Sequence, residues 1–544
     1  MVQKMSRIVL PIVCTIVVFA IQQPTQAQNS PRTVAARVGE LLTEEVLTGR
    51  TTAMAASRVD DETFIRRIYL DIVGELPTVD DILSFTLDTS KYKREKAINT
   101  LLADEAYGKN WARYWRDVIL YRKTEERALI AAQPLEEYLT NRFNKNMSWD
   151  DIATSFITAE GDVRENGECA LIVAQGGKPE ETVAEISRIF MGIQIQCAQC
   201  HNHPTDRWTR EQFHELAAFF PRVASRQSRD QDYRTFYVVA QDSFFRRRQG
   251  NNNNRFIGTP EHHMPDLDHP EEQGKQMQPV FFVTGEKLKV GATDEDRRNT
   301  LADWVSAPQN PWFAHALVNR LWSELVGEGF YEPVDDMGPD RECTAPKTLE
   351  YLAEECIDNE YDIKWLFRTI MATDAYQRES RSRRNYDETP FLANCNQRLR
   401  ADQLYSSLVA ALGLPDRTLA AGRQGYGVAR GPRLAINLQF GFDPSEMRDE
   451  VAGSIPQSLF LMNSFAINQA INSRSNSSLG RLMSEIQNDN DLVTELYLKV
   501  LAREPTKEEM QTCMSYVRNI GQRNEAFEDL LWALVNSTEF LHRR

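Results

Sequence analysis

Cysteine is scarce in this chain, with eight residues in 544. Cys14 lies in an N-terminal apolar segment, without the small residue that normally precedes a lipidated cysteine, so a lipoprotein is not favoured. Two others form a single C-x-x-C pair. The remaining five are an odd and widely spaced set, Cys169, Cys343, Cys356, Cys395 and Cys513. This excludes the disulfide framework of small secreted domains and leaves at most an occasional bridge, such as Cys343 with Cys356.

Basic residues are also fewer than acidic residues. The chain has 63 Lys and Arg against 78 Asp and Glu, a formal net charge of −15. Nucleic acids and anionic membrane surfaces require clustered basic residues, so we expect neither as a partner. Carboxylate pairs such as Asp335-Asp336 are interpreted as solvated.

Common catalytic signatures are missing as well. No nucleophile elbow, P-loop or dinucleotide fingerprint occurs in the context that it requires. The sequence therefore offers no independent case for a hydrolase or a transferase, and whether the protein is an enzyme stays open.

The one long apolar run is at the N-terminus. Lys4 and Arg7 precede the run 8–21, and Thr-Gln-Ala at 25–27 suits signal-peptide cleavage. A membrane span is the alternative, but the run contains Pro11 and is shorter than the ~20 residues that cross a bilayer. We therefore predict a signal peptide over residues 1–27, a mature chain with no membrane span, and export to the periplasm or cell envelope.

The most specific feature is the C-x-x-C-H run formed by Cys197, Cys200 and His201. With only eight Cys and eight His in the chain, this pattern is rare by accident. In an exported protein it is typical of covalent haem c attachment. The two thiols would bond the haem vinyl groups, and His201 would be the axial ligand of the iron. Export and motif agree, because c-type haem is attached outside the cytoplasm.

A metal site is the competing interpretation. Cys197, Cys200, His201 and His203 supply thiolate and imidazole ligands at a spacing that zinc or another transition metal accepts. No second C-x-x-C or H-x-x-H supports it, and a free dithiol is a further alternative. For haem, the sixth ligand is left open among several weak candidates or none. These candidates are His214, His262, His263, His269, Met191, Met264 and Met277.

Helical periodicity dominates the chain. Apolar residues recur at helical spacing over 108–122 and over 181–196, and the latter run leads directly into the motif. A capping box at Thr209 opens another helix, which Pro221 ends, so the motif should lie in a short connection between two helices. From 225 to 296 the periodicity disappears, and strand-like runs occur at 236–239 and 280–283. Helices resume at 297, so we predict a mainly α fold, with two helical domains around an irregular, partly β insert.

An internal similarity links residues 68–78 with residues 496–506. Each segment ends in Pro-Thr followed by an acidic pair, which predicts a helix, a turn and a second helix. A similar short segment ends each copy, and a third segment of this kind lies between the two copies in the sequence. These segments are residues 101–107, 534–540 and 370–376. We interpret the repeat as a reused helical hairpin that packs the core; a repeated docking module is the alternative.

Several longer runs share the pattern of one known family. In the first half they are residues 64–71, 111–115, 196–204, 206–208 and 216–220. In the second half they are residues 310–314, 318–322, 332–336 and 461–464. The chain resembles the planctomycete-type exported family that pairs a cytochrome-c-like domain with a companion domain of unknown function. The resemblance implies a cytochrome-c-like domain at 28–224 and the companion at 297–544, with 225–296 between them.

The sequence therefore favours an exported c-type haem protein for electron transfer or redox support in the cell envelope. The alternative is a non-redox envelope scaffold or binding protein with a structural Cys/His metal site. The partner would be an unidentified redox or envelope protein. The resemblance also implies an association with polysaccharide breakdown and hence with glycans.

Overall fold

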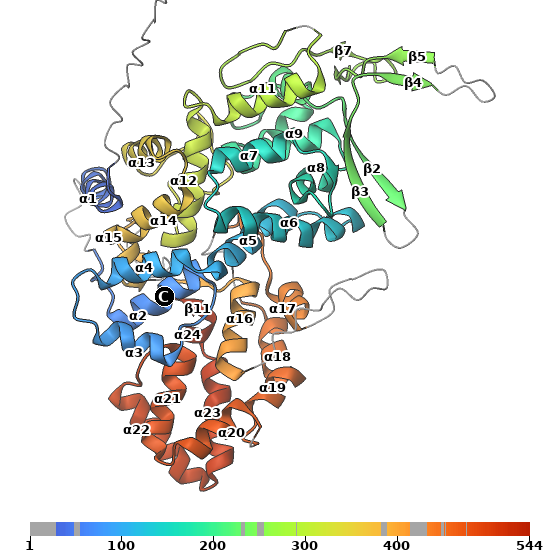
Figure 1. Cartoon of the computed structure of the whole chain (residues 1–544). Coiled ribbons are helices and arrows are strands. Elements are labelled where there is room, and N and C mark those ends of the chain that lie inside the picture. The colour runs from blue at the N-terminus through green and yellow to red at the C-terminus, as the bar shows by residue number, and fades with distance from the viewer. Residues whose placement is uncertain are drawn as a thin grey trace, which may run out of the picture.

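The computed structural model describes most of the chain from residue 29 onward. The described ranges are 29–47, 55–229, 234–246, 255–289, 291–381, 389–413, 432–447, 451, 453–474 and 476–544. The predicted signal peptide lies outside them, as do most of the Arg and Asn runs of the insert. Within these ranges helices predominate and the sheets are small, which confirms a mainly α fold (Figure 1). No helix there is both long and apolar enough to cross a membrane.

The first part of the chain forms ten α-helices with short 3₁₀ and π turns between them. The helices are α1 (Pro31–Leu42), α2 (Asp61–Ile72), α3 (Val79–Leu87), α4 (Lys93–Ala103), α5 (Glu105–Leu120), α6 (Glu126–Asn144), α7 (Trp149–Ile157), α8 (Ala170–Ala174), α9 (Pro179–Met191) and α10 (Arg210–Ala217). The turns are η1 (Thr43–Leu47), η2 (Gly167–Cys169) and η3 (Ile195–Gln199). The helix predicted over 181–196 thus ends at Met191, because Gly192 adopts a left-handed conformation that terminates it.

Short strands lie in the insert and in the chain before it. They are β1 (Gly161–Asp162), β2 (Val223–Arg229), β3 (Arg234–Ala240), β4 (Phe244–Arg246), β5 (Arg255–Gly258), β6 (His263–Met264) and β7 (Lys275–Gln276). An antiparallel sheet has the order β1-β3-β2, and β4 pairs with β5 in a two-stranded arm that projects from the body (Figure 1). The run 236–239 is therefore a strand as predicted. The run 280–283 is not: only Val280 bridges, and a turn follows in which Gly285 N–H donates to Phe281.

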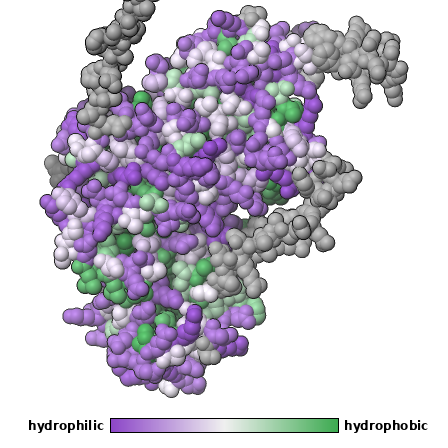
Figure 2. Space-filling model, viewed as in Figure 1, coloured by the Kyte–Doolittle hydropathy of each residue, from purple (hydrophilic) through white to green (hydrophobic). Residues whose placement is uncertain are grey.

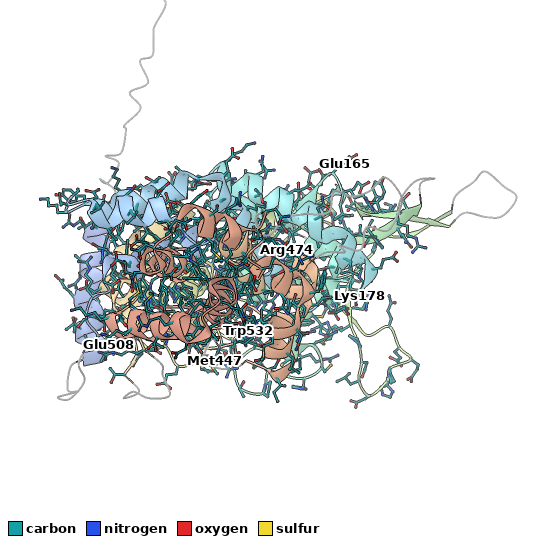
Figure 3. All side chains as sticks on the ribbon, turned by 90° about the horizontal axis from the view of Figure 1, so that it is seen from below. Glu165, Lys178, Met447, Arg474, Glu508 and Trp532 are labelled. Carbon is teal, nitrogen blue, oxygen red and sulfur yellow. The ribbon has the colours of Figure 1, made fainter. Side chains whose placement is uncertain are left out.

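The second half returns to helices. They are α11 (Asp294–Ser306), α12 (Pro311–Val326), α13 (Pro346–Asp358), α14 (Ile363–Ala372), α15 (Asp374–Gln377), α16 (Ala401–Leu412), α17 (Pro432–Phe440), α18 (Ile455–Asn463), α19 (Phe465–Ile471), α20 (Ser478–Glu485), α21 (Asp489–Leu501), α22 (Lys507–Ile520), α23 (Arg523–Val535) and α24 (Thr538–Leu541). Short strands complete it, β8 (Ser380–Arg381), β9 (Asn394–Cys395), β10 (Gln397–Arg398) and β11 (His542–Arg543). Seen from below, the last helices lie in front, marked by Glu508 of α22 and Trp532 of α23 (Figure 3).

Helical periodicity disappears at 225–296, but the hydrophobic core is not divided there. One large cluster of buried side chains runs from Val34 to Phe391, also includes Leu498 and Ala502, and takes in both helical regions. α1 packs against α13 and α14, and Glu45 of η1 accepts hydrogen bonds from the first backbone amides of α13. A second cluster gathers the helices after residue 398 around α2, which contributes Leu70. The predicted domain boundaries stay predictions, and the buried core is shared across them.

The internal similarity corresponds to a repeated backbone arrangement. Thr78 and Thr506 each form a capping box, at the start of α3 and of α22. In the closing segments, the fourth residue is a helix N-cap each time, Asp104, Thr373 or Ser537. The aromatic residue three positions later is fully buried in all three segments. This agrees with the interpretation of the repeat as a core-packing hairpin.

Candidate functional site

The C-x-x-C-H motif lies in the connection between α9 and α10, as predicted. Its first residues form the 3₁₀ turn η3, and Cys200 is the C-cap of that turn. Side chains three residues apart nearly eclipse one another in a 3₁₀ helix, so Cys197 and Cys200 leave the turn on the same side. Both thiols are exposed and neither is in a disulfide. The pair is therefore accessible from solvent.

His201 is exposed, and its ring orientation is set by the backbone. Its Nδ1 lies 2.7 Å from the carbonyl oxygen of Asn202. Because a carbonyl can only accept, Nδ1 is the donor of this hydrogen bond, and in the matching tautomer the lone pair lies on Nε2. A hydrogen bond from one ring nitrogen to a carbonyl is the usual arrangement of a metal-ligating histidine. His201 is thus held in the tautomer that leaves Nε2 free to bind iron or another metal.

The start of the motif turn is anchored by the loop that follows α12. Gln194, the N-cap of η3, donates from Nε2 to Oδ1 of Asp335 at 2.8 Å. The amide of Met337 donates to the carbonyl of Gly192 at 2.7 Å. A Cβ on Gly192 would lie 2.6 Å from the sulfur of Met337, so glycine is required for this approach as well as for its positive φ. The loop that anchors the motif therefore comes from the second half of the chain.

Asp335 is the centre of a buried ionic cluster. It is fully buried and accepts from Arg188 at 3.1 Å and from Arg122 at 3.4 Å. Burial opposes ionisation, but Arg188, Arg320 and Arg122 outweigh it and hold the pKa of Asp335 below its usual value. The expectation of a solvated pair was wrong for this residue. Sequence reasoning missed it because its arginine partners lie far away in the chain, where no local pattern reports them.

The end of η3 rests on a pair of buried histidines. His214 Nε2 lies 3.1 Å from the carbonyl oxygen of Gln199, the residue just before Cys200. That nitrogen must carry the proton, so Nδ1 of His214 accepts from Nε2 of His262 at 2.9 Å. Burial lowers the pKa of His214, and burial together with His214 and His263 lowers the pKa of His262 to about 4. Both rings are therefore neutral at pH 7.

Of the candidate sixth ligands, His214 and His262 lie beside the motif turn, where they hydrogen-bond to Gln199 and to each other. Both ring nitrogens of His214 take part in hydrogen bonds, and so does Nε2 of His262. Met191 and Met277 are buried in the core. His269 is exposed, and His263 directs Nδ1 to the carbonyl of Glu261. Among the described residues, none of these side chains is hydrogen-bonded to His201.

The residues around the motif are held by local contacts. The N–H of His203 donates to the carbonyl of Trp208 at 2.8 Å, and Trp208 packs edge-to-face on Phe282 with ring centroids 4.9 Å apart. The indole N–H of Trp208 is buried and has no hydrogen-bond partner among the residues that the structure describes. Arg210 donates from Nε to the carbonyl of Gln199 at 3.3 Å, so it helps to hold the turn. The capping box of Thr209 with Gln212 is present as predicted.

The motif supplies two exposed thiols and an exposed imidazole, the donor types that either a covalently attached haem or a transition metal would use. In the described residues, no three His, Cys, Asp or Glu side chains lie close enough together to hold a metal ion. The metal set of Cys197, Cys200, His201 and His203 stays a prediction.

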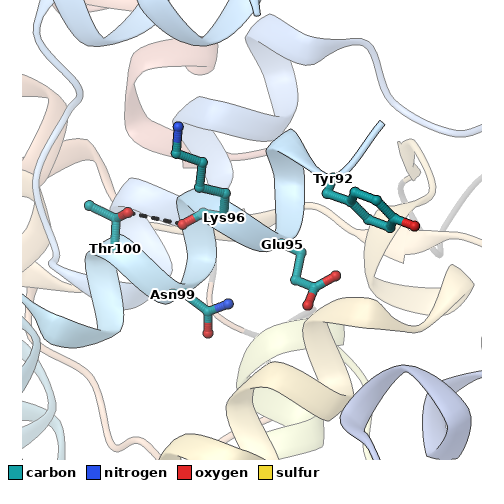
Figure 4. A pocket seen from close by; sticks show the side chains of 5 residues that line it. All are labelled: Tyr92, Glu95, Lys96, Asn99 and Thr100. Carbon is teal, nitrogen blue, oxygen red and sulfur yellow. Dashed lines mark hydrogen bonds between the residues drawn. The ribbon is translucent and has the colours of Figure 1, made fainter. Parts of the chain in front are cut away.

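An open pocket lies elsewhere, on α4 (Figure 4). It is lined by Tyr92, Glu95, Lys96, Asn99 and Thr100. Lys96 and Glu95 bring opposite charges to it, but it contains no cysteine or histidine. None of the predicted site residues lines it.

Two family models match the chain. Residues 46–225 match PSCyt2, a protein of unknown function (DUF1549), and residues 297–428 match PSD1, a protein of unknown function (DUF1553). The chain pairs these two domains of unknown function. The DUF1549 match contains the motif, and the DUF1553 match contains the Asp335 loop that anchors it. Neither the curated proteins nor the solved structures include a match to the chain.

Proposed function

We propose that the protein is an exported c-type haem protein of the cell envelope that takes part in electron transfer. The observation that carries the proposal is the motif geometry, with two exposed thiols on one side of a 3₁₀ turn followed by an imidazole in the ligating tautomer. Cys197 and Cys200 are the anchors, and His201 is the axial ligand. Haem c would supply one-electron transfer.

The position of the motif suits exchange with a protein partner. The thiols and His201 are exposed, while Ile195, Ala198 and Trp208 hold the loop from the inside. A group attached here lies at the surface, where a redox partner can approach closely. The buried supports on both sides of η3 keep the loop in place without enclosing it.

Haem attachment is tested by expressing the full chain in a host with haem-maturation machinery and recording a pyridine haemochrome spectrum. We expect about one covalent haem per chain, none in Cys197→Ala and an unchanged amount in Cys343→Ala, a half-buried thiol outside the motif. In His201→Ala the haem should stay attached, with an altered visible spectrum because the axial ligand is lost.

Absence of haem from the wild-type chain in a competent host would refute the proposal. Metal analysis of the same sample then decides between the alternatives. One zinc per chain, lost in Cys197→Ala and in His203→Ala, would favour an envelope scaffold or binding protein with a structural metal. A metal-free sample that titrates two thiols would indicate a dithiol.

A further inference from the structure

Helix α18 has apolar side chains on two opposite faces. Phe460 and Leu461 face inward: Leu461 is buried, and the ring of Phe460 packs on Phe440 with centroids 5.9 Å apart. Ile455, Leu459 and Met462 follow the i, i+4, i+7 spacing and share another face. They are 77%, 52% and 45% exposed. An amphipathic helix of a monomer buries one apolar stripe, so a second, exposed stripe is the kind of surface that a partner covers.

The stripe extends onto the helices beside it. α17 and α19 both pack against α18, and they expose Leu438 and Phe465 by 79% and 78%. We call these five residues the α18 face: Leu438, Ile455, Leu459, Met462 and Phe465. Five of the eleven large apolar side chains exposed in the described residues belong to it. Figure 2 shows pale hydrophobic colour on the flank where Figure 1 places α18 and α19.

The segment that carries most of this face is free of charge. Residues 451–473 contain no Asp, Glu, Lys, Arg or His, in a chain of which 26% is charged. Depletion of charge together with large apolar side chains is the composition of the core of a protein interface. Single exposed apolar residues need no explanation, whereas five on three helices that pack side by side do.

We propose that the α18 face is the contact through which two copies of this chain form a dimer. A two-fold contact places the same patch on both partners, so it must be complementary to itself. The chain carries a net charge of −15, and two copies repel one another over most of their surfaces. An uncharged apolar face avoids this repulsion. Its five side chains expose roughly 600 Å², close to the ~800 Å² that each partner contributes to a standard interface.

The oligomeric state of the full mature chain tests the proposal, by sedimentation equilibrium between about 0.1 and 100 μM. We expect a wild-type dimer with a dissociation constant in the micromolar range. Leu459→Asp should weaken it about 100-fold, because a two-fold contact buries the new charge twice. Leu129→Asp is the matched control: Leu129 is 63% exposed on α6, away from this face, and its replacement should leave the dimer unchanged.

A wild-type chain that stays monomeric up to about 100 μM would overturn the proposal and leave the face to a different protein partner. So would a dimer that Leu459→Asp does not weaken. Thermal unfolding by circular dichroism checks that the variant folds. If it does not, Phe465→Ser removes a more exposed member of the face and provides the same comparison. Measuring samples with and without haem keeps this result separate from the outcome of the haem experiment.

Discussion

At the scale of single residues, adjacent side chains in this protein have opposite environments. Asp335 is fully buried among arginines, whereas Asp336 is half-buried and pairs with Arg341 at 2.8 Å. Burial raises the pKa of Asp336, and its neighbour Asp335 raises it further. Only the first of the two carboxylates anchors the motif turn through Gln194.

We expect Asp335→Asn to lower the free energy of unfolding by about 2–3 kcal/mol, since it leaves buried arginine charge incompletely paired. Asp336→Asn is the adjacent control and should cost less than about 1 kcal/mol, as partly exposed ion pairs do. Urea unfolding followed by circular dichroism measures both. Equal effects of the two substitutions would contradict the assignment of Asp335 as the centre of the cluster.

The buried histidine pair predicts a dependence of stability on pH. His262 has a pKa of about 4 in the folded protein, below the ordinary value of 6.5, so the unfolded chain binds more protons between these values. The stability due to neutral His262 is complete above pH 6.5 and is lost as the pH falls toward 4.

In a comparison of pH 7 with pH 4, wild type should lose roughly 2 kcal/mol more unfolding free energy than His262→Gln. Glutamine retains a donor for Nδ1 of His214 but does not titrate. Urea unfolding at the two pH values measures this difference. The contributions of Asp and Glu cancel in it, because both proteins contain the same carboxylates. Parallel losses in the two proteins would show that His262 is not the group responsible.

At the scale of elements, the two copies of the repeat use the same turn. Gly74 and Ala502 occupy equivalent positions, and both have positive φ, +75° and +59°. The first copy can use only glycine, because a Cβ there would lie 2.5 Å from Oδ1 of Asn110. Asn110 in turn donates to the carbonyls of Asp71 and Ile72 at the end of α2. The turn and the helix end are therefore packed as one unit.

We expect Gly74→Ala to destabilise the protein by at least about 2 kcal/mol, because it adds a clash with Asn110 to the strain of a left-handed alanine. Gly521→Ala separates the two effects. Gly521 has a φ of +70°, with nothing within 4 Å of its Cβ position, so only the strain of about 1 kcal/mol applies. Thermal or urea unfolding of both variants gives the comparison, and a Gly74→Ala cost no larger than that of Gly521→Ala would contradict it.

At the scale of the whole molecule, the two matched domains share one buried core, and the residues before the first domain pack on the second. The large core cluster includes side chains from both, and the first helix packs on the second half of the chain. Thr348 illustrates this packing, since both its amide and its hydroxyl donate to Glu45. Mostly hydrophilic surface covers the shared core, with hydrophobic patches mainly in the lower half of the view (Figure 2).

We therefore expect residues 28–296, expressed alone, to lack a cooperative unfolding transition, because the fragment exposes the surfaces that α12, α13 and α14 cover. The full mature chain should show the cooperative transition. Circular dichroism during urea titration and binding of a hydrophobic dye measure the two. A fragment with a sharp transition of its own and no dye binding would show that the first domain folds independently.

The sequence by itself determined the features that depend on neighbouring residues. Helical periodicity, the capping boxes at Thr209 and Thr506, the repeated turn and the position of C-x-x-C-H between two helices all follow from spacing within a few residues. The tertiary structure alone decided which carboxylate is buried and which loop anchors Gln194. It also decided that His214 pairs with His262 and that Phe282, in the run that turns at 280–283, packs on Trp208. The reason is that these outcomes rest on partners tens to hundreds of residues away, whose approach is set by how the shared core packs.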